Sequence, residues 1–442
     1  MVRFLDTRDP AFEEGFRALL AAKRESDADV DADVAAIIDE VRRRGDAALI
    51  DYTRRFDGFD PEATGLRFAE EEIAAHIARV PAAERAALEL AAERIRAYHA
   101  RQLPEDARWE DEGGALLGWR WTAVDAAGLY VPGGLASYPS SVLMNAIPAR
   151  VAGVKRLAMA VPTPKGEVNP LVLLAARLAG IDEIWRIGGA QAIAALAYGT
   201  QSIAPVDKIT GPGNAWVAAA KRRVFGQVGI DMIAGPSEVL VIADGRNDPD
   251  WVAVDLLAQA EHDESAQSIL ITDDAAFGRA VAEAVARRLE TLPRSGIAGR
   301  SWERHGAVIT VANWDEAVSL SDRLAPEHLE ILTENAEEVA GKVRHAGAIF
   351  IGRWTPEAIG DYVGGPNHVL PTSRSARFSS GLSVLDFMKR TTLSRMTPEA
   401  LGAIGPAAET LAEAEGLQAH GLSVALRRAA LDESGGAGGG DG

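Results

Sequence analysis

The sequence predicts an α/β protein with two parallel-sheet domains and small helical segments at both ends of the chain. From about residue 125 onward, short apolar runs typical of strands alternate with helical patterns, which is typical of β-α-β units. About nine such runs occur, more than one compact sheet domain holds comfortably. The length of 442 residues, with 47% hydrophobic and 25% charged residues, also favours several globular domains.

The first part of the chain, up to about residue 110, has helical patterns. Apolar residues from Val34 to Leu49 recur near the helical spacing, and Gly58 is placed to end that segment. Further helical patterns follow and carry His76 and His99. We expect both histidines at surface or half-buried positions, without a catalytic role.

Strand-like runs and helices alternate through the middle of the chain. The runs are GLYVPGG (128–134), RLAMAVPTP (156–164), EIWRIGG (183–189), VDKITGPG (206–213), VLVIADG (239–245), SILITDD (268–274), AVITVAN (307–313), LEILT (329–333) and AGAIFIG (346–352). Helical patterns return from Thr397, and the glycine-rich end (432–442) is expected to be disordered.

The composition excludes several classes of function. The chain has 46 basic and 64 acidic residues, a formal charge of −18, whereas nucleic-acid-binding proteins usually carry a basic patch. Cysteine is absent, so a bound metal would need histidine, carboxylate or amide ligands. The apolar stretches are too short to span a membrane, and the N-terminus lacks the features of a signal peptide. We therefore expect a cytoplasmic protein that binds neither nucleic acid nor membranes.

A glycine-rich turn, GPGNAW (Gly211 to Trp216), lies between a predicted strand and a predicted helix. The dinucleotide fingerprint G-x-G-x-x-G is absent, because Trp216 occupies the place of the third glycine. Backbone N–H groups at the start of the helix could still meet a phosphate. An ordinary strand–helix turn explains the glycines equally well.

Gln259 and His262 lie three residues apart at the end of a helix that we expect to begin with Asp248 and Pro249. An amide oxygen and an imidazole on one face could ligate a metal. A polar helix end fits the same residues, since no close-spaced metal motif such as H-E-x-x-H occurs.

Glu327 and His328 follow Pro326 and precede an apolar run, so we expect them on a loop that enters a strand. An adjacent glutamate and histidine provide two acid–base groups with different intrinsic pKa values, which suits two proton transfers. A solvated surface pair is the alternative.

Two further segments carry isolated titratable residues. The run from 359 to 372 is rich in glycine and proline, predicts a tightly shaped loop, and carries Asp361 and His368. Near the C-terminus, Gly416 interrupts a helical pattern, with Glu415 before the break and His420 at the start of the next helix. If they converge, Gln259, His262, Asp361 and His420 form a mixed nitrogen and oxygen set suited to zinc.

Ten segments together resemble the histidinol dehydrogenase family. They are YVPGG (130–134), YPSSVLMNAIPARVAGV (138–154), GGAQAIAALAYGT (188–200), KITGPGNAWV (208–217), AGPSEVLVIAD (234–244), LLAQAEHD (256–263), LAPEHLEI (324–331), GDYVGGPNHVLPT (360–372), ARFSSGLSV (376–384) and EGLQAHGLSV (415–424). They occur in order from about residue 30 to 430, which is far more specific than any single motif.

The resemblance implies an enzyme of histidine biosynthesis. Such an enzyme oxidises L-histidinol to L-histidine in two NAD-dependent steps, and the intermediate L-histidinaldehyde stays bound. It also implies one zinc ion per subunit and an intertwined homodimer with shared active sites.

The resemblance also implies roles for individual residues, each taken from a motif that this sequence shares with the family. The zinc ligands would be Gln259, His262, Asp361 and His420, the last reaching the site from the partner subunit. Glu327 and His328 would be the catalytic acid–base pair. Substrate would contact Ser237, His368 and Glu415, besides His328 and the four zinc ligands. NAD would contact Tyr130, Gln191 and Asn214.

The resemblance further implies two incomplete Rossmann-like α/β domains. We expect a helical segment at 1–30, a first α/β domain from 31–125 and 240–375 that carries the metal and Glu–His segments, and a second from 126–239 on the NAD side. A helical domain at 376–431 would reach the partner subunit, followed by the tail at 432–442.

Three alternatives remain open at the level of sequence. A related zinc- and NAD-dependent dehydrogenase could act on another polar alcohol. A zinc hydrolase would use the metal and Glu327 to activate water without NAD. A binding protein without catalytic activity is disfavoured by the many titratable residues on loops.

Overall fold

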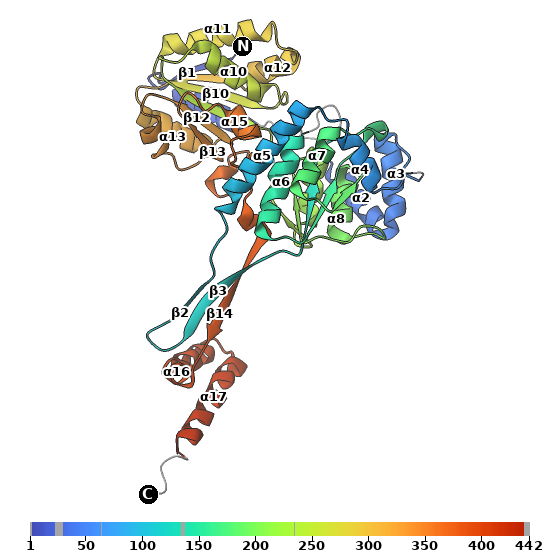
Figure 1. The fold of residues 1–442 in the computed structure, drawn as a ribbon. Coiled ribbons are helices and arrows are strands. Elements are labelled where there is room, and N and C mark those ends of the chain that lie inside the picture. The colour runs from blue at the N-terminus through green and yellow to red at the C-terminus, as the bar shows by residue number, and fades with distance from the viewer. Residues whose placement is uncertain (1, 23–29, 63, 134–137, 234, 437–442) are drawn as a thin grey trace. The chain divides into compact units, whose positions relative to one another are not determined.

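The computed structural model describes residues 2–22, 30–62, 64–133, 138–233 and 235–436. The chain divides into two compact units, one formed by residues 1–103 and 124–387 and the other by residues 104–123 and 388–442 (Figure 1). The α/β class is confirmed, because the first unit contains two parallel sheets with helices on their faces.

The larger sheet of the first unit has six strands in the order β1-β11-β10-β9-β12-β13, and every pair is parallel. The strands are β1 (Arg3–Asp6), β9 (Glu238–Ala243), β10 (Gln267–Thr272), β11 (Ala307–Thr310), β12 (His328–Leu332) and β13 (Ala348–Ile351). The central strands β9 and β10 are buried along their whole length, as expected for a parallel sheet covered on both faces.

Helices cover both faces of this sheet. One apolar cluster joins the sheet to α1 (Phe12–Ala21), α13 (Trp314–Leu324) and α14 (Ala336–Ala340). A second cluster on the other face joins it to α10 (Pro249–Ala260), α11 (Ala275–Leu289) and α12 (Ser295–His305). The short helix α15 (Glu357–Tyr362) follows β13.

The smaller sheet has five parallel strands in the order β6-β5-β4-β7-β8. They are β4 (Ala126–Tyr130), β5 (Arg156–Ala160), β6 (Glu183–Trp185), β7 (Lys208–Thr210) and β8 (Gly229–Ile230). One apolar cluster joins this sheet to α2 (Asp31–Arg44), α3 (Asp46–Asp57), α8 (Gly189–Tyr198) and α9 (Ala215–Val224). A second layer contains α4 (Glu70–Ile77), α5 (Ala82–Ala100), α6 (Pro139–Ala152) and α7 (Pro170–Ala179), with α6 packed against α5 and α7 (Figure 1).

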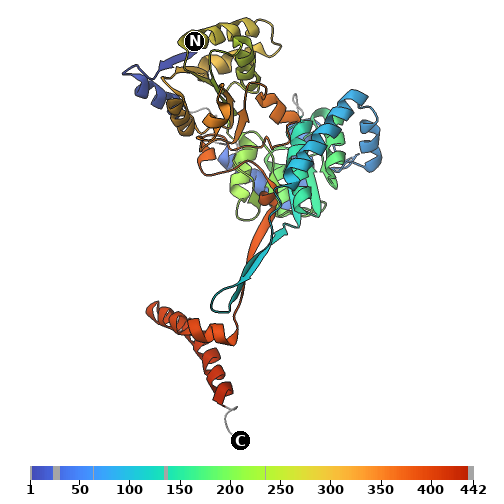
Figure 2. The ribbon, with the colours of Figure 1, turned by 60° about the vertical axis from the view of Figure 1, so that its left-hand side comes forward.

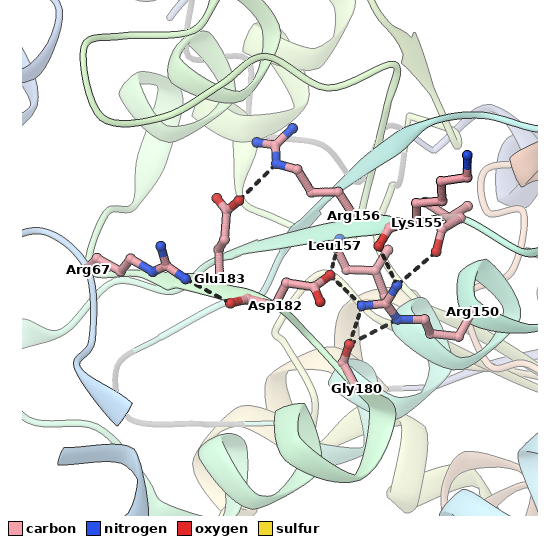
Figure 3. A network of polar contacts seen from close by, with 9 residues as sticks. Arg67, Arg150, Lys155, Arg156, Leu157, Gly180, Asp182 and Glu183 are labelled. Carbon is pink, nitrogen blue, oxygen red and sulfur yellow. Dashed lines mark hydrogen bonds and ion pairs between the residues drawn. The ribbon is translucent and has the colours of Figure 1, made fainter. Parts of the chain in front are cut away.

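A polar network ties together the amino ends of strands in the smaller sheet (Figure 3). Arg156, at the start of β5, donates from Nε to the carboxylate of Glu183, at the start of β6, over 2.9 Å. Arg150 donates to the carbonyl oxygens of Val154 and Lys155, each at 2.8 Å. Because these contacts lie at the amino ends of the strands, they leave the carboxyl ends for ligands.

The second unit combines a three-stranded antiparallel sheet with a helix pair (Figure 2). The strand order is β14-β3-β2, with β2 (Ala107–Glu110), β3 (Leu116–Ala123) and β14 (Met388–Arg395). Helices α16 (Pro398–Ala414) and α17 (Gln418–Gly436) pack against each other. Large apolar side chains remain exposed on them, namely Ile404, Leu411, Leu422 and Leu426.

All nine strand-like runs of the sequence form strands, from β4 to β7 and from β9 to β13. Strands β1, β2, β3, β8 and β14 were not expected; β1, β2 and β8 are short and β14 is mostly polar, whereas β3 is long and largely apolar and lies between the part predicted to be helical, up to about residue 110, and the alternating part that begins at about residue 125. Gly45, with a φ of 58°, divides the expected helix after residue 30 into α2 and α3, and Gly58, with a φ of 61°, ends α3 as expected.

The packing corrects the expected domain boundaries. The expected helical segment at 1–30 contains a strand, and β1 and α1 pack with the six-stranded sheet. Helices α2 and α3, expected with 240–375, pack instead on the five-stranded sheet. The segment 376–431, expected to be helical, includes the long strand β14, which pairs with β3. Helix α17 continues to Gly436, so 432–436 are helical, and the remaining tail lies outside the described residues.

Among the described residues, no helix combines the length and the apolar character needed to cross a bilayer.

Candidate active site

His328 is the first residue of β12 and is buried with 4% of its surface exposed. Its Nδ1 lies 3.0 Å from the carbonyl oxygen of Glu238, and a carbonyl can only accept. We therefore assign the ring proton to Nδ1, which leaves a lone pair on Nε2. Within the described part of the chain, Nε2 is buried without a hydrogen-bond partner. Burial lowers the pKa of His328 to about 4, so the imidazole is neutral at neutral pH and Nε2 can accept a proton.

Glu327 immediately precedes β12 and is 7% exposed. Its Oε2 accepts a hydrogen bond of 3.0 Å from the backbone N–H of Glu238, and the same oxygen lies 3.7 Å from Nδ1 of His328. Strand β12 pairs with β9 in parallel register. The start of β9 therefore holds both expected catalytic side chains through the backbone of one residue.

Gln259 lies on the last turn of α10, and Asp248 caps the start of that helix as expected, with Pro249 at its first position. The side chain of Gln259 is fully buried. In one orientation of its amide, the nitrogen donates to the carbonyl of Glu238 and to Oε1 of Glu357, each at 3.2 Å. These two bonds use both amide hydrogens, and the nitrogen lies 3.1 Å from the protonated Nδ1 of His328 without a hydrogen bond to it. The amide oxygen then faces Nδ1 of His262 at 3.2 Å, so an oxygen and a nitrogen ligand lie together.

Asp361 lies on α15, not on the irregular loop that the sequence predicts. Pro356 precedes the first residue of this short helix, which ends before Gly364 and Gly365. Ligand atoms of His328, Glu357 and Asp361 all lie within 4.8 Å of one another. The structure thus brings together Gln259, Glu327 and His328 through direct contacts, and Asp361 beside them.

Glu357 is a site residue that the sequence did not single out. It is 3% exposed, and its Oε1 lies 3.3 Å from Nδ1 of His328. Burial, and then the charge of Asp361, raise the pKa of Glu357 well above its usual range. Its position four residues before Asp361 places both acids on one helix face, a signal that the sequence contained.

The donor set fits a divalent cation. Two carboxyl groups crowd one small site beside a buried amide and an imidazole, an arrangement that a cation stabilises because it favours ionised carboxylates. Gln259, His262 and Asp361 would hold it, with Glu357 bonded to the amide of Gln259.

His368 lies next to Asp361 in space. Its Nδ1 donates to the backbone oxygen of Asp361 over 3.0 Å, and its Nε2 lies 3.3 Å from Oγ of Ser141 on α6. Burial lowers the pKa of His368, so the ring is neutral. Ser237 is half-buried and directly precedes Glu238 at the start of β9.

His99 is wholly buried, which corrects the expected surface or half-buried position. Its Nδ1 donates to the carbonyl of Ile95, and its Nε2 lies 3.3 Å from the side-chain nitrogen of Asn367. The same nitrogen donates to the carbonyl of Met144 over 2.6 Å. His99 therefore holds Asn367, the residue that precedes His368, by hydrogen bonding. Helical periodicity could not reveal this role.

Three residues lie at the carboxyl ends of strands in the smaller sheet, where ligands of open α/β sheets bind: Tyr130, Gln191 and Asn214. Tyr130 ends β4, and its hydroxyl accepts a hydrogen bond of 3.1 Å from the N–H of Gly189, the first residue of α8. Burial raises the pKa of Tyr130, so the phenol stays neutral. Asn214 caps α9.

Glu415 and His420 belong to the second unit. Glu415 directly follows α16 as its C-cap, and His420 lies in the first turn of α17, on either side of the expected break at Gly416. Both side chains are exposed.

The chain matches the family model of histidinol dehydrogenase over residues 20–428. A histidinol dehydrogenase from Ruegeria pomeroyi is 74% identical over 427 residues, which cover 97% of this chain and 99% of the relative. One from Cereibacter sphaeroides is 71% identical over 433 residues, covering 98% of this chain and all of the relative (100%). The crystal structure of histidinol dehydrogenase from Elizabethkingia anophelis superposes with a TM-score of 0.93 at 37% identity, covering 98% and 99% of the two chains.

Proposed function

Because the chain belongs to the histidinol dehydrogenase family, we propose that Glu327 and His328 perform the acid–base steps of its two oxidations. The chain is an NAD-dependent oxidoreductase of histidine biosynthesis that converts L-histidinol through L-histidinaldehyde to L-histidine. The family match along almost the whole chain carries this conclusion, and the buried Nε2 of His328 supports the residue roles.

His328 removes the hydroxyl proton of histidinol with its unprotonated Nε2. This role is supported by the hydrogen bond from Nδ1 to Glu238, which fixes the tautomer and the ring orientation. NAD, when bound, accepts a hydride in each oxidation. Because the pKa of His328 is about 4, the imidazolium releases this proton to water after the first oxidation, and the same nitrogen then deprotonates the hydrated aldehyde before the second.

Glu327 activates the water that hydrates the aldehyde. Its carboxylate is held by the backbone N–H of Glu238, beside the imidazole of His328. A carboxylate oriented in this way acts as a general base on water, while His328 serves the alcohol and the hydrate.

We further propose that one zinc ion binds Gln259, His262 and Asp361, together with His420 of the partner subunit. Zinc, when bound, supplies Lewis acidity and orients the amine and imidazole of histidinol. Ser237, His368 and Glu415 would contact the substrate as well. The exposed positions of Glu415 and His420 suit a contribution to a neighbouring subunit, which is the basis for proposing a homodimer with shared sites.

Tyr130, Gln191 and Asn214 are proposed to contact NAD. Their support is their common position at the carboxyl ends of β4, β6 and β7. We propose that they belong to an NAD-binding domain of residues 31–103 and 124–230, which is supported by the packing of α2, α3, α8 and α9 on the five-stranded sheet. A cytoplasmic location is also part of this proposal and is consistent with the family match.

Substrate competition tests the function. The NADH formed from L-histidinol at limiting concentration is measured in the presence of excess polar alcohols that lack an imidazole. We expect no inhibition by these alcohols and a strong preference for histidinol. Faster turnover of another alcohol would assign the chain to a different dehydrogenase activity.

A further inference from the structure

Gly211 is held from both sides by two charged side chains. Its backbone N–H donates to Oδ2 of Asp231 over 2.9 Å, and its carbonyl oxygen accepts a hydrogen bond of 3.0 Å from Nζ of Lys221. Lys221 lies on α9 and Asp231 follows β8, and the two side chains form an ion pair. We call Lys221 and Asp231 the Gly211 clamp.

The Gly211 clamp is almost completely buried, with 3% of the Lys221 side chain and 1% of the Asp231 side chain exposed. Removing two charges from water is costly, and a buried ion pair often contributes little net stability compared with apolar residues of similar size. Apolar side chains, however, cannot bond to both the N–H and the carbonyl of one peptide residue. The distinctive property of the clamp is therefore the geometry that it imposes on Gly211.

Gly211 begins the turn that leads to Asn214, one of the residues proposed to contact NAD. Its φ of 116° is accessible mainly to glycine, and a Cβ at this position would clash with the carbonyl oxygen of Tyr130. A Cβ at Gly213 would likewise clash with the side chain of Val217. The turn thus packs closely against Tyr130 on one side and against α9 on the other.

Asn214 is oriented by the end of this turn. Its side-chain oxygen accepts from the N–H groups of Trp216 and Val217, at 3.1 and 3.2 Å. Because capping uses the oxygen, the amide NH2 is the part of Asn214 that can donate to NAD. A shift of Gly211 would move this group and the N–H groups at the start of α9 together.

We propose that the buried ion pair of Lys221 and Asp231 is a positioning device that holds the turn from Gly211 to Asn214 in its NAD-binding shape. This inference rests on the proposed NAD site. Neither charged group needs to touch NAD, since each acts on the backbone of Gly211.

A double variant, Lys221→Met with Asp231→Asn, tests the proposal without leaving one buried charge unpaired. We expect the KM for NAD and the Kd for NADH, measured by fluorescence, to rise at least about tenfold, which corresponds to 1.4 kcal/mol. The KM for histidinol should stay within about twofold. A purely structural role would instead lower the folded fraction, seen by circular dichroism, or change both KM values alike.

The matched control is Arg156→Met with Glu183→Gln, which removes a half-buried ion pair at the amino ends of the same sheet (Figure 3). It should leave the KM for NAD unchanged.

If the double variant of the clamp does not fold, Asp231→Glu replaces it, because this variant keeps the charge and displaces the carboxylate by one methylene. A folded clamp variant with the normal KM for NAD would overturn the proposal.

The variant Asn214→Ala distinguishes a failure of the clamp proposal from a failure of the proposed NAD site. If Asn214→Ala raises the KM for NAD and the clamp variants do not, the NAD site stands and the clamp proposal is wrong. If Asn214→Ala leaves this KM unchanged, the NAD site itself is misplaced and the clamp proposal fails with it.

Discussion

The imidazole Nδ1 of His328 lies 3.0 Å from the backbone carbonyl oxygen of Glu238. The backbone N–H of the same glutamate donates to Glu327 over 3.0 Å. Strand β9 thus sets the tautomer of the histidine and the position of the carboxylate through main-chain groups, which a side-chain substitution at Glu238 would not remove. The two acid–base residues are held on a rigid sheet, as precise proton transfer requires.

Changing Glu327→Gln should slow aldehyde oxidation more than alcohol oxidation. The amide keeps the shape but cannot act as a base on water, so the aldehyde step should fall by about 10²- to 10⁴-fold. Single-turnover rates starting from histidinol and from histidinaldehyde measure the two steps separately. Glu337→Gln, on an exposed position of α14, is the matched control. Equal losses in both half-reactions would refute the division of labour between Glu327 and His328.

Changing Glu357→Gln should weaken zinc binding by about 10- to 100-fold, as is usual when a group that orients a metal ligand is removed. The carboxylate accepts from the amide nitrogen of Gln259 and so directs the amide oxygen towards His262. Competition with a chromophoric chelator measures the affinity of the purified protein. Glu264→Gln, a half-buried acid that follows α10 and pairs with Arg300, should leave zinc affinity unchanged. The same affinity in both variants would mean that Glu357 does not orient Gln259.

The carboxyl groups of the half-buried Asp255 and the buried Glu330 should make the free energy of unfolding fall as pH rises. Burial raises the pKa of Asp255 from 3.8 to about 6, while burial and the neighbouring Asp255 raise the pKa of Glu330 well above its usual range. A raised folded-state pKa means that the folded protein binds more protons than the unfolded chain. The stabilisation is therefore complete below about pH 4 and is lost as pH rises through about 6 and above.

Asp255→Asn isolates this effect because the amide does not titrate. From pH 4 to 7, the free energy of unfolding of the unsubstituted protein should fall by about 1–3 kcal/mol relative to that of the variant. Urea unfolding of both proteins in zinc-free buffer measures the difference. A constant difference across this range would show that Asp255 has an ordinary pKa.

Mixing two inactive variants should restore activity if subunits share their sites. Glu327→Gln damages one chain, and His420→Ala removes the ligand that a chain would donate to its partner. After unfolding and refolding together, random pairing should restore about a quarter of full activity, since each mixed dimer has one intact site. The two variants refolded separately are the control. No recovery in the mixture, with dimers confirmed by light scattering, would mean that His420 serves its own chain.

The sequence predicted most strands of the two parallel sheets, all except β1 and β8, because buried parallel strands are nearly continuous apolar runs. It missed β14, in which most side chains are exposed and no apolar face alternates. It also missed β1, which has only four residues, two of them charged. Local patterns reveal strands that bury side chains, and they do not reveal strands that depend mainly on pairing.

Sequence patterns also could not assign α2 and α3 to a sheet. Their apolar residues predicted one amphipathic helical segment, which Gly45 divides, but an apolar face does not specify which sheet it covers. For the site, residue types and motifs pointed to Gln259, Glu327 and His328, which the structure places in contact. The role of His99 was missed because its partner Asn367 lies about 270 residues away in the chain, and only the fold brings the two together. Glu357 was missed although its spacing from Asp361 was a visible signal, because its contact with His328 also depends on the fold.

The stoichiometry of NADH tests the central claim most directly. Purified, zinc-loaded protein is incubated with limiting L-histidinol and excess NAD until the reaction ends, and the NADH formed per histidinol consumed is counted. We expect about two, because Glu327 and His328 together serve both oxidations. A value of about one would mean that the aldehyde is released, and no NADH from the zinc-loaded protein would contradict the assignment to histidinol.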